Sequence, residues 1–253
     1  MNFLTGSNLS EESRKSVSII FTVLNEEENI GPLVKALQNI ERSGKGWYIH
    51  SLIFADGGST DNTIKSVEAS RSFLPELEFM ITNQKLKPGT APATIEAAAV
   101  TGDDWTIVMD ADLQHPVHRI PSLLDAKASG FDLVIASRNV EGGKISRSIS
   151  RGAVSRGADI LCRLYLKNIK NISDPLSGFF VADTKTISSL PAREGLYKLL
   201  LYILASNSGI NVKEVPYSFG KRIHGKSKLT ASSTHFMRRY MKELSYYRKI
   251  ERS

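Results

Sequence analysis

Short apolar runs alternate with longer amphipathic stretches through the first half of the chain. The first run, S-V-S-I-I-F-T-V-L from Ser16, predicts a buried strand, and apolar residues at helical spacing follow it. Further strand-like runs occur at 48–55, 77–82, 105–109 and 133–137, and helical stretches follow the first three of these. The alternation predicts an α/β fold with a mostly parallel central sheet, helices on both faces and ligands at the carboxyl ends of the strands.

Three of the predicted strands end in polar clusters, at 25–28, 56–61 and 110–115. Because the carboxyl ends of parallel strands share one edge of a sheet, we expect the clusters to line one crevice. Singly, each has a structural explanation, since Glu26 and its neighbours suit a helix N-terminus and Ser59 suits a cap. We expect Asp61 to cap a helix, and Asp56 to accept a hydrogen bond from a nucleotide.

Asp110 and Asp112 predict a metal site, because they follow an apolar run and are separated by one residue. Carboxylate oxygens suit Mg²⁺ or Mn²⁺, which keep positions open for water and substrate phosphates. The alternative is a helix cap at Asp110 and a solvated Asp112. With Gln114 and His115, the loop has four polar side chains in six residues, more than a cap requires. No partner for His115 is evident in the sequence, so we assign it no role.

The second half of the chain is basic, with five Lys or Arg residues between positions 138 and 156. Arg151 and Ser155 are one helical turn apart, which suits a phosphate, although a solvated basic face is the alternative. The expected apolar stripe of this helix consists of Ile149, Ala153, Ile160, Leu161 and Leu164. Cys162 lies in this apolar setting and is expected to be a buried thiol. Asp174 fits either an Asx-turn or an acceptor site.

We divide the chain into a flexible N-terminus (1–15), one domain (16–230) and a basic amphipathic C-terminal helix (231–253). The final helix either packs on the domain or lies on an anionic membrane. A basic loop near position 225 suits a diphosphate, with a solvated hairpin as the alternative. No signal peptide or spanning segment of roughly 20 apolar residues is evident. The net charge of +7 indicates an anionic partner.

With these motifs in view, the chain resembles the family 2 glycosyltransferases of GT-A fold over about 17–229, and most closely the dolichol-phosphate (polyprenol-phosphate) mannose synthases. D-A-D-L-Q-H-P, from Asp110, is the most specific match. The other matching motifs are S-I-I-F-T-V-L-N-E-E-E-N-I, D-G-G-S-T-D-N-T, S-R-N-V-E-G-G, S-R-G-A, S-D-P-L-S-G-F and R-I-H-G-K-S-K-L.

The resemblance implies a role for each matching residue. The metal ligands would be Asp110, Asp112 and Gln114. The donor site would consist of Asn25, Glu26, Asp56, Asp110, Asp112, Arg222 and Lys228, and the lipid phosphate would bind Arg138, Arg151 and Ser155. The catalytic residues would be Asp112, Arg138 and Arg222. Two departures from the family pattern, at 22–24 and at Gly57, remove a tyrosine and a carboxylate from the nucleotide pocket, so the base and sugar stay open.

The resemblance therefore predicts a metal-dependent, inverting transfer of mannose from GDP-mannose to a polyprenyl or dolichyl phosphate. We expect a cytoplasmic protein, peripheral on the cytoplasmic face of a membrane, held there directly or by an anchoring partner. The alternatives are a glucosyl- or N-acetylhexosaminyl-transferase that uses a UDP-sugar, and a degenerate nucleotide-binding module. Nucleic acid is not expected as a partner, because the basic residues lie beside an acidic rim without a stacking surface.

Overall fold

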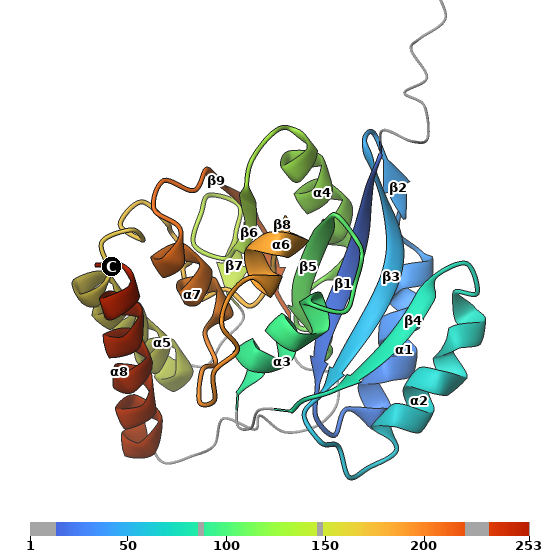
Figure 1. Cartoon of the computed structure of the whole chain (residues 1–253), viewed down its shortest axis with the longest axis horizontal. Helices are drawn as coiled ribbons and strands as arrows, with labels where there is room; N and C mark the ends of the chain where they lie inside the picture. Colours follow the sequence, from blue (N-terminus) through green and yellow to red (C-terminus); the bar gives the residue numbers. More distant parts are fainter. Residues whose placement is uncertain (1–13, 86–88, 146–148, 221–232, 253) are drawn as a thin grey trace, which may run out of the picture.

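A computed structural model describes residues 14–85, 89–145, 149–220 and 233–252 of the chain. Its main sheet has the strand order β2-β3-β1-β5-β8-β6-β9, with β4 also paired to β3 (Figure 1). These strands are β1 (Lys15–Val23), β2 (Ser43–Gly44), β3 (Trp47–Asp56), β4 (Glu78–Asn83), β5 (Trp105–Asp110), β6 (Leu133–Ser137), β8 (Phe180–Asp183) and β9 (Val212–Pro216). A small parallel pair, β7 (Lys144–Ile145) and β10 (Ser218–Phe219), lies beyond it.

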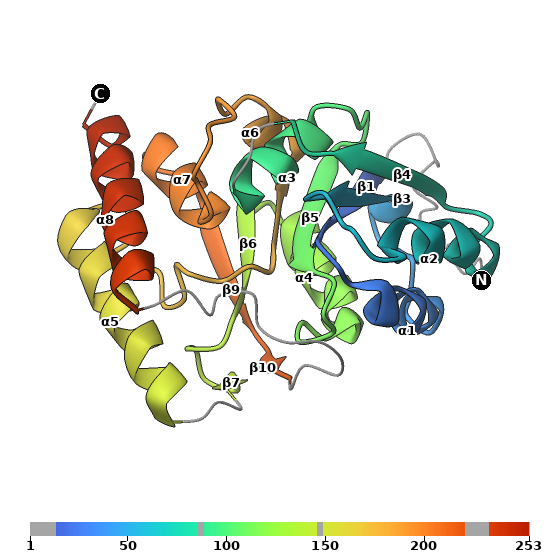
Figure 2. The same cartoon turned by 90° about the horizontal axis from the view of Figure 1, so that it is seen from below.

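Helices cover both faces of the sheet, as predicted. They are α1 (Glu27–Gln38), α2 (Thr63–Ser70), α3 (Thr90–Ala98), α4 (Ile120–Ala128), α5 (Ile149–Tyr165), α6 (Thr184–Ser188), α7 (Leu199–Ser206) and α8 (Ser233–Ile250), with 3-10 turns η2 (Arg71–Phe73) and η3 (Val117–Arg119). Figure 2 shows α3, α6 and α7 over one face, and α1 and α4 over the other. The predicted α/β class is therefore confirmed.

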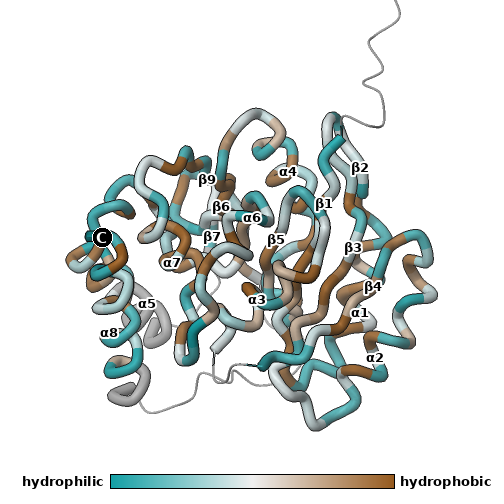
Figure 3. Tube along the Cα trace, in the orientation of Figure 1, coloured by the Kyte–Doolittle hydropathy of each residue, from teal (hydrophilic) through white to brown (hydrophobic). Residues whose placement is uncertain are grey.

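Each face of the sheet has its own apolar core, because successive side chains of a strand point to opposite faces. Ile20 and Val108 face the core beneath α3 and α7, whereas Phe21 and Met109 face the core beneath α1 and α4. In Figure 3 the hydrophobic colour follows the central strands and α7. The alternation holds the strand ends rigidly and therefore fixes the loops that follow them.

The sheet is mixed in direction, since β8 runs antiparallel to both of its neighbours, β5 and β6. β1, β3, β4 and β5 form a parallel block, and β6 and β9 form a parallel pair. The sequence predicted a mostly parallel sheet, and an apolar run such as that of β8 carries no information about strand direction.

The expected apolar stripe of α5 is wrong in two positions. Ile160 and Leu164 are 59 % and 73 % exposed, whereas Ala158 and Cys162 are buried. The helix thus turns Ala158 and Cys162 toward the domain, with Leu161 and Tyr165 partly buried against the same core. Burial raises the pKa of the Cys162 thiol to about 11, which confirms the expected buried thiol and makes it a weak nucleophile at neutral pH.

Helix α8 packs its apolar stripe on the domain, which is the first of the two alternatives left open for it, and contact with a membrane stays a prediction. Tyr240, Leu244 and Tyr247 are at most 1 % exposed. The Tyr240 hydroxyl donates to the Ala158 carbonyl of α5 at 2.9 Å, and the buried Glu243 carboxylate accepts the Tyr197 and Lys198 amides before α7. No helix among the described residues is long and apolar enough to cross a membrane.

Candidate active site

The structure brings the ends of β1, β3 and β5 to one edge of the sheet. β1 lies between the other two strands, and Val23 pairs with Asp56 while Thr22 pairs with Asp110. The three polar loops that follow these strands are therefore neighbours. The Thr22 hydroxyl reaches the Asp110 carboxylate at 3.4 Å.

Asn25 links the β1 and β3 loops. It takes a left-handed backbone conformation, φ 51°, which asparagine tolerates better than most residues. Its side-chain oxygen accepts the Thr60 backbone amide at 2.8 Å, and its own backbone amide donates to the Ser59 hydroxyl at 2.9 Å. Glu26 is buried and accepts a 2.6 Å hydrogen bond from the Asn29 side chain. These contacts fix the β1 and β3 loops relative to each other, and a nucleotide site at these loops stays a prediction.

Asp56 closes its own loop. Its carboxylate is 4 % exposed and accepts the backbone amides of Gly58 and Ser59, each at 3.0 Å. The sequence did not indicate this local role, and the expected contact of Asp56 to a nucleotide stays a prediction. A nucleotide could hydrogen-bond to Asp56 only through the carboxylate lone pairs that these contacts do not use.

Asp61 accepts the first amides of two helices, Glu27 of α1 and Thr63 of α2, as expected of a capping residue. Burial opposes ionisation of this carboxyl, but the Thr63 and Glu27 hydrogen bonds outweigh burial and lower its pKa. Asp61 therefore joins the β1 and β3 loops in addition to capping the N-terminus of a helix.

The loop after β5 makes a tight turn at Leu113. The Asp112 carboxylate, 4 % exposed, accepts the Gln114 amide at 3.0 Å, and Leu113 between them has φ 61°. Two hydrogen bonds hold Gln114 to Gly220. The side-chain NH₂ of Gln114 donates to the Gly220 carbonyl at 3.1 Å, and the Gly220 amide donates to the backbone carbonyl of Gln114 at 2.9 Å. With its NH₂ so used, the Gln114 amide oxygen is directed elsewhere.

His115 has a partner that the sequence did not indicate. Its Nε2 lies 3.4 Å from an Asp110 carboxylate oxygen, and its ring, 2 % exposed, packs against Phe179, Tyr217 and Phe219. Nδ1 is buried without a partner among the described residues. A proton on Nε2 lets the ring donate to the carboxylate, whereas a proton on Nδ1 would set two lone pairs against each other. His115 therefore orients Asp110.

Asp110 combines exposure with a lowered pKa. Its side chain is 53 % exposed. Desolvation acts to raise its pKa, but the hydrogen bond and charge of His115, with the charge of Lys198, lower it overall. An ionised, accessible carboxylate is a suitable ligand for a hard cation. Lys198, which precedes α7, was not among the predicted site residues because nothing in its local pattern places it near β5.

The donor set fits a divalent cation whose remaining ligands come from a substrate. Asp110, Asp112 and Gln114 supply oxygen atoms from one short loop. The described residues contain no group of three or more His, Cys, Asp or Glu side chains that could hold a metal ion. Mg²⁺ is commonly held by one or two carboxylates with water and substrate phosphates, so this sparse set matches its use.

Arg138 is held by Asp174 in a buried, two-pronged ion pair. Nε and Nη2 each lie 2.6 Å from a different Asp174 oxygen, and the two side chains are 8 % and 2 % exposed. Burial acts to lower the pKa of Arg138, but Asp174 raises it overall, with a smaller contribution from Asp110. Asp174 is thus the partner of Arg138, a contact that the sequence did not indicate, and its place in an acceptor site stays a prediction.

Several predicted residues lie outside what the structure describes. Arg222 and Lys228 fall in the 221–232 segment, outside the described residues. Arg151 and Ser155 belong to α5, but their side chains also lie outside the description. The structure therefore leaves these four predictions untested.

Comparison with known proteins shows which family the chain resembles. Residues 18–187 match glycosyl transferase family 2. The dolichol-phosphate mannosyltransferase of Pyrococcus furiosus is 34 % identical over 84 % of this chain, which spans 59 % of that relative's length. The enzymes of the same name from Mycosarcoma maydis and Saccharomyces cerevisiae are 29 % and 26 % identical over 94 % and 91 % of the chain, and over 81 % and 87 % of their own lengths.

Solved structures show the same fold at lower identity. Glucosyl-3-phosphoglycerate synthase from Mycobacterium tuberculosis, solved with Mn²⁺, UDP and glucosyl-3-phosphoglycerate, gives a TM-score of 0.66 at 22 % identity, over 98 % of this chain and 86 % of that one. The same enzyme with Mg²⁺ and UDP gives 0.65 at 21 % identity, over 96 % and 85 %. The predicted resemblance is confirmed: the chain belongs to glycosyl transferase family 2.

Proposed function

We propose that the protein transfers a mannosyl group from GDP-mannose to a polyprenyl or dolichyl phosphate, with inversion at the anomeric carbon. The observation that carries the proposal is the D-A-D-L-Q-H loop, which lies at the shared strand edge with Asp110 accessible and ionised. Three curated relatives that match most of the chain are dolichol-phosphate mannosyltransferases.

On the donor side, Asp110, Asp112 and Gln114 would hold Mg²⁺ or Mn²⁺. The cation would supply Lewis-acid stabilisation of the departing diphosphate, worth several kcal/mol. His115 keeps Asp110 in its orientation. Asn25, Glu26 and Asp56 would surround the nucleoside, and Arg222 with Lys228 would neutralise the diphosphate.

On the acceptor side, Arg138, Arg151 and Ser155 would bind the lipid phosphate. A phosphate is already an anion at neutral pH, so the attacking oxygen needs no strong general base. The task of these residues is to position and stabilise charge. Asp174 supports that task by holding Arg138 in one orientation. A guanidinium fixed in advance loses little conformational entropy when it binds a phosphate.

A lipid acceptor implies that the protein works at a membrane. We propose a peripheral position on the cytoplasmic face, either by direct contact or through an anchoring partner. The relatives are named for dolichol phosphate, which supports this proposal.

A second candidate is glucosyl transfer from UDP-glucose. The fold neighbour was solved with UDP-glucose, and the 22–24 and Gly57 departures fall where a base would bind. A direct test offers GDP-mannose, UDP-glucose and UDP-N-acetylglucosamine, each with a polyprenyl phosphate and Mn²⁺, and identifies the lipid product by mass. A mannolipid supports the proposal, and a glucolipid supports the second candidate. Binding of nucleotide without any product would indicate a non-catalytic module.

A further inference from the structure

A buried carboxylate of α8 holds the backbone of the 196–198 segment, which precedes α7. The carboxylate belongs to Glu243, which is 3 % exposed. One of its oxygens, Oε1, accepts the backbone amides of Tyr197 and Lys198, the latter at 3.1 Å. The Tyr247 hydroxyl lies 3.2 Å from the same oxygen and 3.2 Å from the Lys198 carbonyl. Helix α8 therefore fixes the backbone at Lys198.

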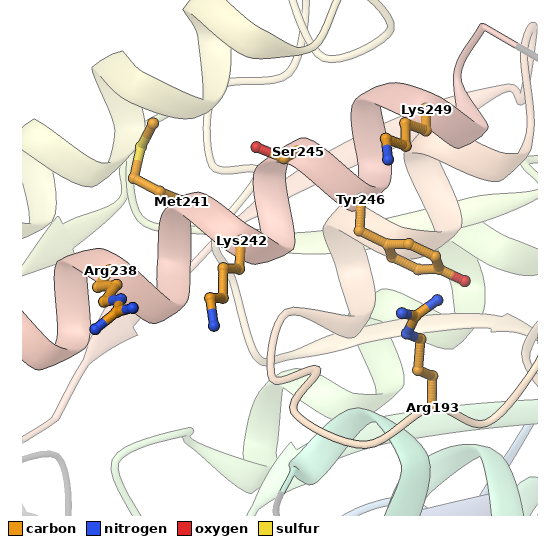
Figure 4. Close-up of a pocket in the computed structure, with 7 residues that line it drawn as sticks. All are labelled: Arg193, Arg238, Met241, Lys242, Ser245, Tyr246 and Lys249. Carbon is orange, nitrogen blue, oxygen red and sulfur yellow. The ribbon is translucent and has the colours of Figure 1, made fainter.

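Two cation–π contacts extend this attachment along the 191–197 loop. The guanidinium of Arg239, on α8, lies 3.8 Å from the ring centroid of Tyr197. The guanidinium of Arg193, on the loop, lies 4.5 Å from the ring centroid of Tyr246, on α8 (Figure 4). Figure 4 also shows Arg193 facing the basic side chains of α8 across a groove. The loop is thus packed on α8 before the chain reaches Lys198.

The 196–198 segment also contacts the N-terminus of α3. The Ala91 amide donates to the Leu196 carbonyl at 3.2 Å, and the Thr90 hydroxyl donates to the Tyr197 carbonyl at 3.0 Å. Gly89 is the N-cap of α3, and a Cβ at this position would clash with the Leu196 carbonyl. The close approach of the two segments therefore requires glycine here.

The N-terminus of α3 belongs to the sheet edge that carries the candidate site. The Gln84 side chain donates to the Gly89 carbonyl, and the Gln84 amide donates to the Asp56 carbonyl at 3.0 Å. Asp56 ends β3 and Asp110 ends β5, and both strands pair in parallel with β1 between them. These contacts place Lys198 at the same edge as Asp110.

Lysine is an unfavourable residue at this position of the fold. Lys198 is the N-cap of α7, where the preferred side chains accept a helix amide, whereas an ammonium has no acceptor. Its charge also lies at the positive end of the helix dipole. Desolvation acts to raise the pKa of Asp110, but His115 and then the charge of Lys198 lower it overall. A residue that breaks the local rule and directs its charge to another site is typical of a functional position.

We infer that Lys198 is a further active-site cation, which binds a substrate phosphate beside Asp110, and that Glu243 of α8 positions it. The inference rests on the proposed function, because that reaction brings a donor diphosphate and an acceptor phosphate to this edge of the sheet. Lys198 is partly exposed, so a ligand can reach it. An ammonium is a compact charge with three donors, which suits a phosphate oxygen.

Calorimetry on the full chain tests Lys198. The ligands are GDP and UDP, each with Mn²⁺, for the donor phosphates, and a short-chain prenyl phosphate for the acceptor. The test variant is Lys198→Gln. The control, Lys185→Gln, removes an exposed lysine of α6, which follows the end of β8 beside the start of β5, at the opposite edge of the sheet.

We expect Lys198→Gln to weaken binding of one phosphate ligand about 10-fold or more, because a charge-assisted hydrogen bond is lost. The control should change binding by less than about twofold. Weaker nucleotide binding assigns Lys198 to the donor, and weaker prenyl phosphate binding assigns it to the acceptor. Unchanged affinity for all the ligands would overturn the inference, and so would an equal loss in the control.

Two substitutions test the positioning role of Glu243. Glu243→Gln keeps a side-chain oxygen for the two amides, and we expect binding within about threefold of wild type. Glu243→Met removes this acceptor and should reproduce the loss of Lys198→Gln. The double variant Lys198→Gln/Glu243→Met should bind no more weakly than Lys198→Gln, because both changes act through one ammonium. Additive losses would refute the positioning role.

A milder substitution serves if Glu243→Met does not fold. Tyr247→Phe removes only the hydroxyl that contacts the Glu243 carboxylate and the Lys198 carbonyl. It should weaken binding of the same ligand about threefold, and unchanged binding would then refute the positioning role. If wild type binds these ligands but makes no mannolipid, the proposed function fails while the binding comparison still decides the inference. If wild type binds none of them, the inference is overturned.

Discussion

The Arg138–Asp174 pair offers the sharpest test of how structure serves function in this protein. Substituting Asp174 with alanine leaves a guanidinium that is 8 % exposed without its counter-ion. It also removes the acceptor for the Arg138 backbone amide, which donates to the same carboxylate at 2.9 Å. The carboxylate thus supports both the side chain and the backbone of Arg138.

Removal of one partner of a buried ion pair costs about 3–5 kcal/mol, because the remaining charge is left desolvated. We expect Asp174→Ala to lower the free energy of unfolding by about 4 kcal/mol, within this range. For a chain of this size, the loss lowers Tm by roughly 8–16 °C. Asp104→Ala is a matched control, because Asp104 pairs with Lys15 at side-chain exposures of 40 % and 51 %. It should cost at most about 1 kcal/mol.

Urea unfolding followed by circular dichroism measures both changes. A companion variant, Arg138→Met/Asp174→Leu, replaces the pair with apolar side chains and leaves no buried charge, so it should be less destabilised than Asp174→Ala, with a remaining cost of about 1–3 kcal/mol from the Arg138 backbone amide that loses its acceptor. We expect this variant to lose transfer to polyprenyl phosphate. A loss below about 1 kcal/mol for Asp174→Ala would refute the energetic reasoning. Wild-type transfer by the double variant would show that Arg138 serves the fold and not the acceptor.

Three further predictions follow from the site and from α8. Asp110→Ala should lower metal-dependent transfer by about 100-fold or more with an unchanged circular dichroism spectrum, and near-normal turnover would contradict the metal site. His115→Phe keeps the aromatic packing but removes the Nε2 donor, so Mn²⁺ affinity measured by calorimetry with GDP should fall about fivefold. The free energy of unfolding should stay unchanged, because the substitution also removes the buried Nδ1 that has no hydrogen-bond partner among the described residues. Unchanged affinity would exclude the orienting role. Burial raises the pKa of Glu243, so ionisation of this carboxyl costs stability as pH rises above about 4.5, its ordinary value. Glu243→Gln should therefore gain stability relative to wild type between pH 4.5 and 8 in urea unfolding, and a constant difference across this range would contradict it.

The order of strands and helices could be predicted because each element buries a regular subset of its own residues. The β1 strand, for example, is marked by a short continuous apolar run, and the α1 helix by apolar residues with a period of about 3.6 residues. The direction of β8 could not be predicted, because antiparallel and parallel strands bury the same residues. The facing side of α5 was misjudged since Ile160 and Leu164 are apolar, yet the domain offers them no surface.

The same distinction between local pattern and tertiary contact applies to the residues of the site. Asp110, Asp112 and Gln114 are close in sequence, so their shared loop was evident from spacing alone. The roles of His115 and Asp174 depend on contacts that no local pattern encodes. The ring of His115 reaches Asp110 because Phe179, Tyr217 and Phe219, remote in sequence, enclose it.

The sequence by itself determined the α/β class, the family and the loop proposed to bind a metal, because these depend on local periodicity and on one short motif. The tertiary structure alone decided that Asp174 holds Arg138 and that α8 turns its apolar stripe inward. It also decided that the basic face of α8 meets Arg193 across a groove. These features arise from contacts between segments that are distant along the chain. Their packing buries the apolar side chains and leaves the unpaired charges at the surface.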